Sequence, residues 1–284
     1  MDRVWHWVLA GVVFVALGAG AFYWWYKQSK APRIAVPPVV EAPAPAPPVA
    51  ASALEEPAIR HPIEEAPASK EQPLASLPAL SRPAEADAYI KNALIEAVGR
   101  AAVFSFLNVD NFPGRVVATV DNLPRQKASS MLWPVVPTGG RFGVEQRGDG
   151  SYVSASNASR YAPFVRFIES IDTAKVAAVY LRLYPLFQRA YEDQGYPGKY
   201  FNDRLVAVID HLLATPDLPA APKVTLTEVK GPIKPARPWV TYEFEDPKLE
   251  ARSAGQKMLL RMGTANAQRL KAKLTEFRRQ IAKG

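Results

Sequence analysis

The sequence predicts a mainly α-helical (α+β) domain that follows a single transmembrane helix and a Pro/Ala-rich linker. Three observations predict this organisation: an apolar run at the amino terminus, a stretch rich in proline and alanine, and mostly helical periodicity in the remainder. We therefore divide the chain into a transmembrane anchor (residues 1–30), a linker (31–83) and a globular domain (84–284).

The composition excludes several classes of protein. The 284 residues include no cysteine and three histidines, and the formal net charge is +8. Without cysteine there is no disulfide scaffold, no thiolate metal site and no cysteine nucleophile. Three histidines leave little room for a histidine-based catalytic or metal site, and the sequence predicts no cofactor.

The first element is the apolar run Val4–Tyr26, which contains no Asp, Glu, Lys or Arg. As a helix this run is ~35 Å long, enough to cross a hydrocarbon core of ~30 Å. Aromatic residues mark both of its ends, as is typical of a helix held at two membrane interfaces. The run therefore predicts an uncleaved anchor in a lipid bilayer. A cleavable signal peptide that ends near Ala19–Ala21 is the alternative.

The orientation and association of this span remain open from the sequence. Lys27, Lys30 and Arg33 follow the span, so the positive-inside rule is nearly balanced. We expect an inner-membrane protein with a periplasmic domain, on the basis of the linker and the lack of cysteine. Gly11 and Gly18 share a helix face and would allow two spans to approach, so a weak homodimer is an alternative.

The second element is the linker, residues 31–83, which holds 13 of the 27 prolines. Proline lacks a backbone donor and alanine has little surface to bury, so an extended tether is expected rather than a packed core. A proline-rich recognition motif is the sharper alternative.

Apolar spacing predicts the helices of the domain. The clearest helix is Thr173–Asp193, whose apolar stripe lies opposite a basic face, with a bend expected at Pro185. Asp246-Pro247 is typical of a helix start, and Gly263-Thr264 is expected to separate two helices. Further helices are predicted over residues 87–98, 112–123, 163–172 and 202–214, and over the last turns through Leu270, Leu274, Phe277 and Ile281.

Two β-hairpins are expected beside the helices. Residues 142–146 and 151–155 flank the turn Arg147–Gly150, and residues 224–229 and 239–244 alternate in polarity. The class is therefore α+β rather than purely helical.

Two candidate surfaces emerge from the domain. The first is a tyrosine-rich corner between two predicted helices, which suits either a recognition surface or a packed corner. The second is the basic carboxyl end, where Lys248–Gly284 carries a surplus of +8 and suits an acidic polymer, anionic lipid or nucleic acid, or a solvated outer face. The corner comprises Tyr184, Tyr191, Tyr200, Asp203 and Arg204, and the basic surface Arg269, Lys271, Lys273, Arg278 and Arg279.

The sequence contains no strong catalytic or nucleotide-binding motif. The sequence has no Walker A loop, no dinucleotide-binding glycine pattern and no Gly-x-Ser-x-Gly elbow. His211 is the one histidine within the predicted domain, and its neighbour Asp210 points ~100° away around a helix. His211 is therefore expected on the helix surface, and the sequence identifies no catalytic residue.

Several of these residues resemble the domain of unknown function 3014 family. The resemblance is carried by Leu183–Gln188, Gly195–Pro197 and Val208–Asp210, and by Tyr242–Leu249, Gly255–Gly263 and Val117–Leu123. It covers most of residues 85–280 and implies a bacterial, membrane-anchored protein with a proline-rich linker. It implies no activity.

Together these features predict a membrane-anchored envelope protein with a structural or recognition role. Its expected partners are the bilayer and an envelope protein or acidic polymer. A membrane-tethered enzyme that acts on an envelope polymer is the first alternative. The second is a cytoplasm-facing domain whose basic carboxyl-terminal helix binds anionic lipid or, less favoured, nucleic acid.

Overall fold

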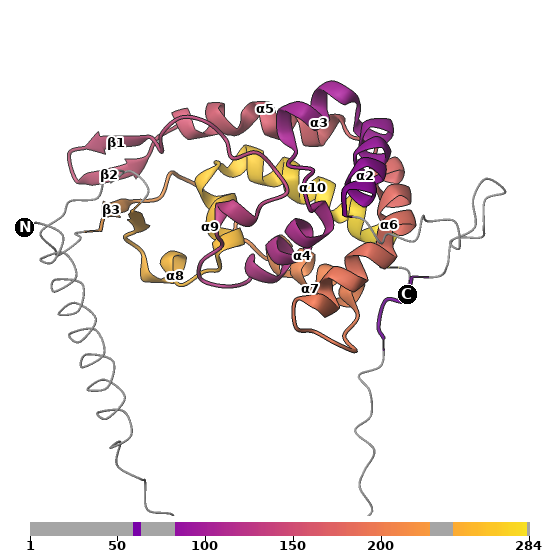
Figure 1. The fold of residues 1–284 in the computed structure, drawn as a ribbon. Helices are drawn as coiled ribbons and strands as arrows, with labels where there is room; N and C mark the ends of the chain where they lie inside the picture. Colours follow the sequence, from indigo (N-terminus) through magenta and orange to yellow (C-terminus); the bar gives the residue numbers. More distant parts are fainter. Residues whose placement is uncertain (1–58, 64–82, 228–240, 283–284) are drawn as a thin grey trace, which may run out of the picture. The chain divides into compact units, whose positions relative to one another are not determined.

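The computed structural model describes residues 59–63, 83–227 and 241–282. These ranges are mainly helical, with nine α-helices and two two-stranded antiparallel sheets (Figure 1), as the sequence predicts. None of the helices in these ranges is both long and apolar enough to cross a membrane. The predicted span Val4–Tyr26 and most of the predicted linker lie outside the described residues.

Three helices open the domain: α2 (Pro83–Val98), α3 (Arg100–Phe106) and α4 (Phe112–Asn122). Helix α2 starts at the last residue of the predicted linker and packs on both α3 and α6. Gly99 adopts φ 86° between α2 and α3, a left-handed conformation that glycine adopts without steric cost. The glycine therefore lets the chain turn between two helices without a loop.

Helix α5 (Ser156–Ser170) begins seven residues before the predicted start at Pro163. Proline is favoured in the first helical turn, which is why the sequence suggested a boundary there. In the structure Pro163 lies inside the helix with its side chain exposed, so the interior proline is accommodated at the helix surface.

Helices α6 (Thr173–Asp193) and α7 (Phe201–Leu213) agree closely with the sequence prediction. The Asp172 carboxylate caps α6 by accepting the amides of Ala174 and Lys175 at 3.0 and 3.3 Å. Such a cap satisfies amides that have no partner within the helix and fixes its first residue.

The carboxyl-terminal part contains α8 (Pro247–Glu250), α9 (Ala254–Arg261) and α10 (Thr264–Ile281). Asp246 caps α8 through the amide of Lys248, and Gly263 separates α9 from α10 with φ 87°, both as predicted. Helix α10 contacts α5, α6, α7 and α9, so it is the central helix of the bundle (Figure 1).

The main core lies among α2, α4, α6, α7 and α10. Its largest fully buried side chain is Phe201, at the start of α7. The apolar stripe of α6 faces this core as the periodicity predicts. The buried members of that stripe are Tyr180, Leu183, Tyr184, Phe187 and Tyr191.

The two sheets are small and adjoin each other. Strand β1 (Val144–Arg147) pairs with β2 (Gly150–Val153), and β3 (Val224–Leu226) pairs with β4 (Tyr242–Phe244). A bridge from Tyr152 to Lys223 joins the two sheets. Both hairpin predictions are confirmed in position, with shorter strands than expected. A second core of Val153, Val224, Phe244 and Leu260 lies beneath them.

Candidate functional site

The tyrosine-rich corner is divided between core and surface. Tyr184 and Tyr191 expose 8% and 4% of their area and therefore belong to the core. Burial is the main reason why the pKa of Tyr184 is raised far above its usual value, so its hydroxyl stays protonated. That hydroxyl donates to Gln188 Oε1 at 3.0 Å. These two tyrosines support the α6–α7 packing rather than a binding surface.

Tyr200 and Asp203 contact a segment that the sequence placed in the linker. Residues Ile59–Ile63 lie against the first turn of α7, where Asp203 accepts two of their backbone amides and Tyr200 accepts a third. Asn202, which the sequence reasoning did not single out, donates to the carbonyl oxygen of His61. The sequence signal for this contact was the presence of two isoleucines and a histidine in a stretch that is otherwise rich in Pro and Ala.

Arg204 turns to a different cluster, around the buried carboxylate of Asp121 on α4. The Arg204 Nη2 group donates to Asp121 Oδ1 at 3.0 Å, Tyr196 donates its hydroxyl at 2.9 Å, and Arg125 pairs with the same carboxylate. Burial by itself would raise the pKa of Asp121, but the hydrogen bonds from Tyr196 and Arg125 and the nearby positive charges outweigh it and lower the pKa. This cluster ties α4 to α7 and to the turn that precedes α7.

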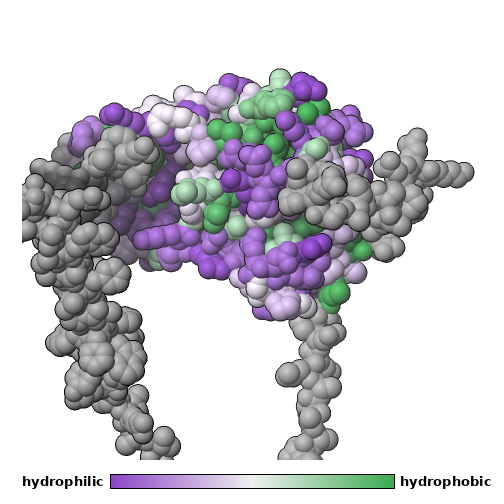
Figure 2. Space-filling model, viewed as in Figure 1, coloured by the Kyte–Doolittle hydropathy of each residue, from purple (hydrophilic) through white to green (hydrophobic). Residues whose placement is uncertain are grey.

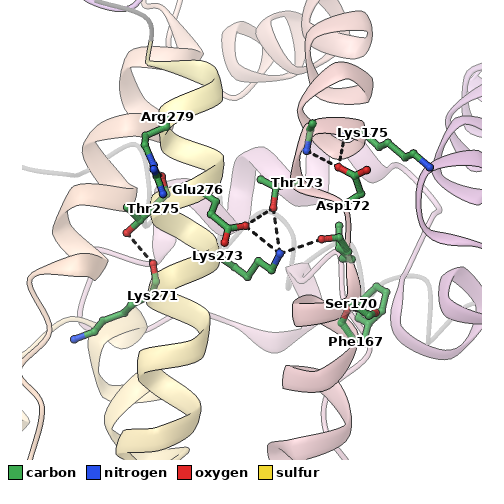
Figure 3. Close-up of polar contacts among 12 residues, drawn as sticks. Phe167, Ser170, Asp172, Thr173, Lys175, Lys271, Lys273, Thr275, Glu276 and Arg279 are labelled. Atoms are coloured by element: carbon green, nitrogen blue, oxygen red, sulfur yellow. Dashed lines mark hydrogen bonds and ion pairs between the residues drawn. The ribbon is translucent and has the colours of Figure 1, made fainter.

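The predicted basic surface on α10 is largely paired with acids. Arg269 pairs with Glu169, Lys271 with Asp217, Lys273 with Glu276 and Arg278 with Asp210, while Arg279 donates to the carbonyl of Thr275. Figure 3 shows Lys273 and Glu276 directed toward Thr173 at the start of α6. Much of the local positive charge is therefore neutralised within the fold, which the count of charges along the chain could not reveal.

His211 is half-buried rather than on the helix surface. Its Nε2 atom lies 2.8 Å from Ser253 Oγ, and Ser253 is a buried residue that caps α9. Asp210 instead pairs with Arg278, so the adjacent acid and histidine form no dyad, as expected. A serine covered by protein in a capping role has no access to a substrate. No group of His, Asp or Glu suited to a metal ion occurs in the described ranges.

The described part of the chain contains an apolar groove of ≈ 1040 Å³. It is bounded by α4, α5, α9 and α10 and by the extended segment 133–142. Its walls carry aromatic, aliphatic and methionine side chains, including Trp133, Phe142, Phe164, Met258, Leu274 and Phe277. The apolar stripe of α10 predicted at Leu270, Leu274 and Phe277 is therefore shared between the core and this groove.

Cations line the groove without any acid. Its lining includes Arg141, Arg160, Arg261 and Lys273 and neither Asp nor Glu. Arg160 stacks over the Tyr161 ring at 4.7 Å and donates to carbonyl and hydroxyl oxygens. Arg261 donates to the Tyr242 carbonyl, and its burial lowers its pKa. Neither guanidinium has a carboxylate within ion-pair distance among the described residues.

Exposed apolar residues lie next to the groove. Met131, Leu132 and Val136 expose 82%, 43% and 42% of their area, and Val136 itself lines the groove. Phe104 on α3 is exposed as well, and Figure 2 shows hydrophobic residues grouped around α3 on the viewed face. An apolar rim beside an apolar groove is typical of a binding surface.

Residues 112–278 match the sequence profile of a family described as protein of unknown function (DUF3014). The chain belongs to this family. No curated protein and no solved structure matches the chain significantly. The DUF3014 match runs from α4 into the last turns of α10 and so includes the helices that bound the groove. The docked segment Ile59–Ile63 lies before the matched region.

Proposed function

We propose that this chain is a membrane-anchored envelope protein whose domain binds an amphiphile with an anionic head group in the apolar groove. The observation that carries the proposal is an apolar groove of ≈ 1040 Å³ whose lining holds three arginines and no acid, besides Lys273, which pairs with Glu276. Ligand pockets of ~300–1,000 Å³ with mostly apolar walls and a few polar groups are typical of small-molecule sites.

The chemistry of the lining favours one class of ligand. Aliphatic and aromatic walls favour burial of a hydrocarbon chain at about 25 cal/mol per Å² of apolar surface. Guanidinium groups favour a carboxylate or phosphate, with which they form charge-assisted hydrogen bonds. Arg160 and Arg261 hold that charge at the groove, and neither has a carboxylate within ion-pair distance in the described ranges, while Glu243 and Glu250 act on Arg261 from farther away. An anionic amphiphile satisfies both requirements.

Binding is favoured over catalysis at this site. The residues that line the groove include no histidine, aspartate or glutamate, so they supply no general base in the usual range of pKa. The enzyme alternative would need its catalytic groups elsewhere. A role in recognition also fits the prediction that a linker tethers the domain to a membrane anchor.

Ligand binding can be measured on the full chain in nanodiscs of phosphatidylcholine, which avoids detergent. The probe is a dansyl-labelled fatty acid, with its methyl ester as the uncharged comparison and empty nanodiscs as the background. We expect saturable binding of the acid. We also expect the ester to bind about 10- to 150-fold more weakly, because it loses one charge-assisted contact of ~1.5–3 kcal/mol.

Two variants locate the site. Val136→Asp places a carboxylate at the groove rim and should weaken binding of the acid about tenfold or more, through repulsion of the anion and loss of apolar contact. Leu226→Asp is the matched control, since Leu226 is 46% exposed and lies outside the groove. Arg160→Gln should weaken binding, whereas Arg166→Gln on the same helix, exposed and outside the groove, should not. Equal effects of either variant and its control would refute the proposed site.

A further inference from the structure

The segment Ile59–Ile63 is held almost wholly through its backbone. The amides of Arg60 and His61 donate to Asp203 Oδ2 and Oδ1 at 2.9 and 2.7 Å, so one carboxylate receives two successive N–H groups. The amide of Ile63 donates to the Tyr200 hydroxyl at 2.7 Å. The two bonds to the Asp203 carboxylate are the stronger ones, because hydrogen bonds to a charged group are worth more than neutral ones.

Proline occupies a position of this run where no N–H group is needed. Pro62 lies between His61 and Ile63 and has no N–H, while all three neighbouring amides are bound. Asn202 completes the contact by donating Nδ2 to the His61 carbonyl at 2.9 Å. The Asn202 side chain is fully buried and donates to the Ile281 carbonyl at the end of α10 as well.

The side chains of the segment contribute less than its backbone. Ile63 packs against the main core, while Ile59 exposes 53% of its area and the His61 Nδ1 atom has no partner in the described ranges. The recognised pattern is therefore a short bent run with two consecutive amides, a proline and a further amide, and it places few requirements on the side chains.

We propose that Tyr200, Asn202 and Asp203 form a peptide-binding site whose ligand is the chain's own segment Ile59–Ile63, bound within the same molecule. The site anchors the preceding chain to the first turn of α7 and to the end of α10. The docked segment therefore holds the chain to the domain before the start of α2 at Pro83. The length of chain available as a tether ends there, which sets how far the domain can move from a membrane anchor.

Amide hydrogen exchange of the full chain in phosphatidylcholine nanodiscs tests the site. Peptic fragments that contain residues 57–65 report the amides of Arg60, His61 and Ile63. We expect these amides to exchange at least about tenfold more slowly than in an unstructured chain, because each is hydrogen-bonded in the docked state. Asp203→Asn keeps the shape of the side chain but loses the charge and one acceptor, and should abolish most of this protection.

Three comparisons make the result decisive. Tyr200→Phe should release Ile63 while Arg60 and His61 stay protected, and His61→Ala should leave protection within about twofold, because its backbone is unchanged. Unaltered exchange within α6 shows that each variant is folded. The proposal is overturned if the amides of the wild-type segment exchange at the unstructured rate, or if Asp203→Asn leaves them protected. Protection that increases with protein concentration would assign the segment to a second copy and would also overturn it.

Discussion

Replacing Asp121 with Ala is expected to lower the free energy of unfolding by about 2–3 kcal/mol, because it removes hydrogen bonds to a charged, largely buried carboxylate whose arginine partners stay partly in contact with solvent. The Asp121 side chain is only 10% exposed and binds Arg125, Arg204 and Tyr196 at once. Its loss leaves two guanidinium groups close together without their shared carboxylate, and it disconnects α4 from α7. Chemical denaturation followed by circular dichroism measures the change.

Asp210→Ala is the matched control for this variant. Asp210 pairs with Arg278 across α7 and α10, but Asp210 is exposed and Arg278 is only half-buried, so the expected cost is at most ~1 kcal/mol. The dependence on pH gives an independent check. Because the folded-state pKa of Asp121 lies below its ordinary value of 3.8, the stability it contributes is complete above that value and is lost as the pH falls through the lowered pKa. The Asp121→Ala protein should lack this part of the acid destabilisation. Equal costs for the two alanine variants would contradict the assignment of Asp121 as a structural centre.

Replacing Asn202 with Ala is expected to cost roughly 2–5 kcal/mol, because it leaves buried polar groups without partners at ~1–3 kcal/mol each. The Asn202 Oδ1 atom accepts from the Tyr180 hydroxyl at 3.0 Å, and Nδ2 donates to the Ile281 carbonyl at 2.9 Å. Both partners are buried and have little access to water in exchange. The side chain therefore joins α6, α7 and the end of α10 at one point.

A double-mutant cycle separates the cost of leaving the Tyr180 hydroxyl without its acceptor from the other effects of the Asn202→Ala substitution. In a Tyr180→Phe background the hydroxyl is already absent, so Asn202→Ala should cost about 1–2 kcal/mol less than in the wild type. Asn122→Ala is the control, since its amide donates only to the Ala118 carbonyl one turn earlier on α4 and is worth about 1 kcal/mol. Additive costs of the Asn202 and Tyr180 variants would show that their hydrogen bond contributes little.

The helices of the domain could be predicted wherever a local signal set both ends. Asp172 before Thr173 and Gly195 after Asp193 bound α6, and the apolar stripe between them has one clear period. The start of α5 could not be predicted in this way. Ser154, Ser156 and Asn157 lie around its first residue and Pro163 lies in its interior, and both features are locally typical of a boundary. Packing of α5 on α10 extends the helix past them.

The groove and the pairing of the basic residues depend on contacts between distant parts of the chain. Thr119 on α4 and Phe277 on α10 line the same groove, and no spacing along the sequence relates them. Arg278 and Asp210 are likewise brought together only by the packing of α10 on α7. The sequence could therefore locate the charge on α10 but could not show how much of it is paired.

The docked segment illustrates a different limit. It lies within a stretch rich in proline and alanine and contains Pro62 itself, and the composition of that stretch predicts an extended tether. Its contacts with Tyr200 and Asp203 are made by backbone amides, so they do not require particular side chains that a sequence pattern could reveal. Of the tyrosine-rich corner, Tyr200 and Asp203 contact this segment, whereas Tyr184 and Tyr191 are buried in the core.

The most direct test of the proposed ligand site uses the four methionines as position markers. Met258 and Met262 line the groove, whereas Met131 lies outside its lining with 82% of its area exposed, and Met1 is at the amino terminus. Methyl NMR of the full chain labelled with ¹³C-methyl methionine, in phosphatidylcholine nanodiscs, can follow all four during titration with a saturated fatty acid.

Binding in the groove predicts saturable shifts of the Met258 and Met262 methyl signals, with Met1 and Met131 unchanged, and a much smaller response to the methyl ester. Val136→Asp should move the titration midpoint about tenfold higher in ligand concentration. If the exposed Met131 responds while Met258 and Met262 do not, or if none of the four signals saturates, the groove does not bind an anionic amphiphile.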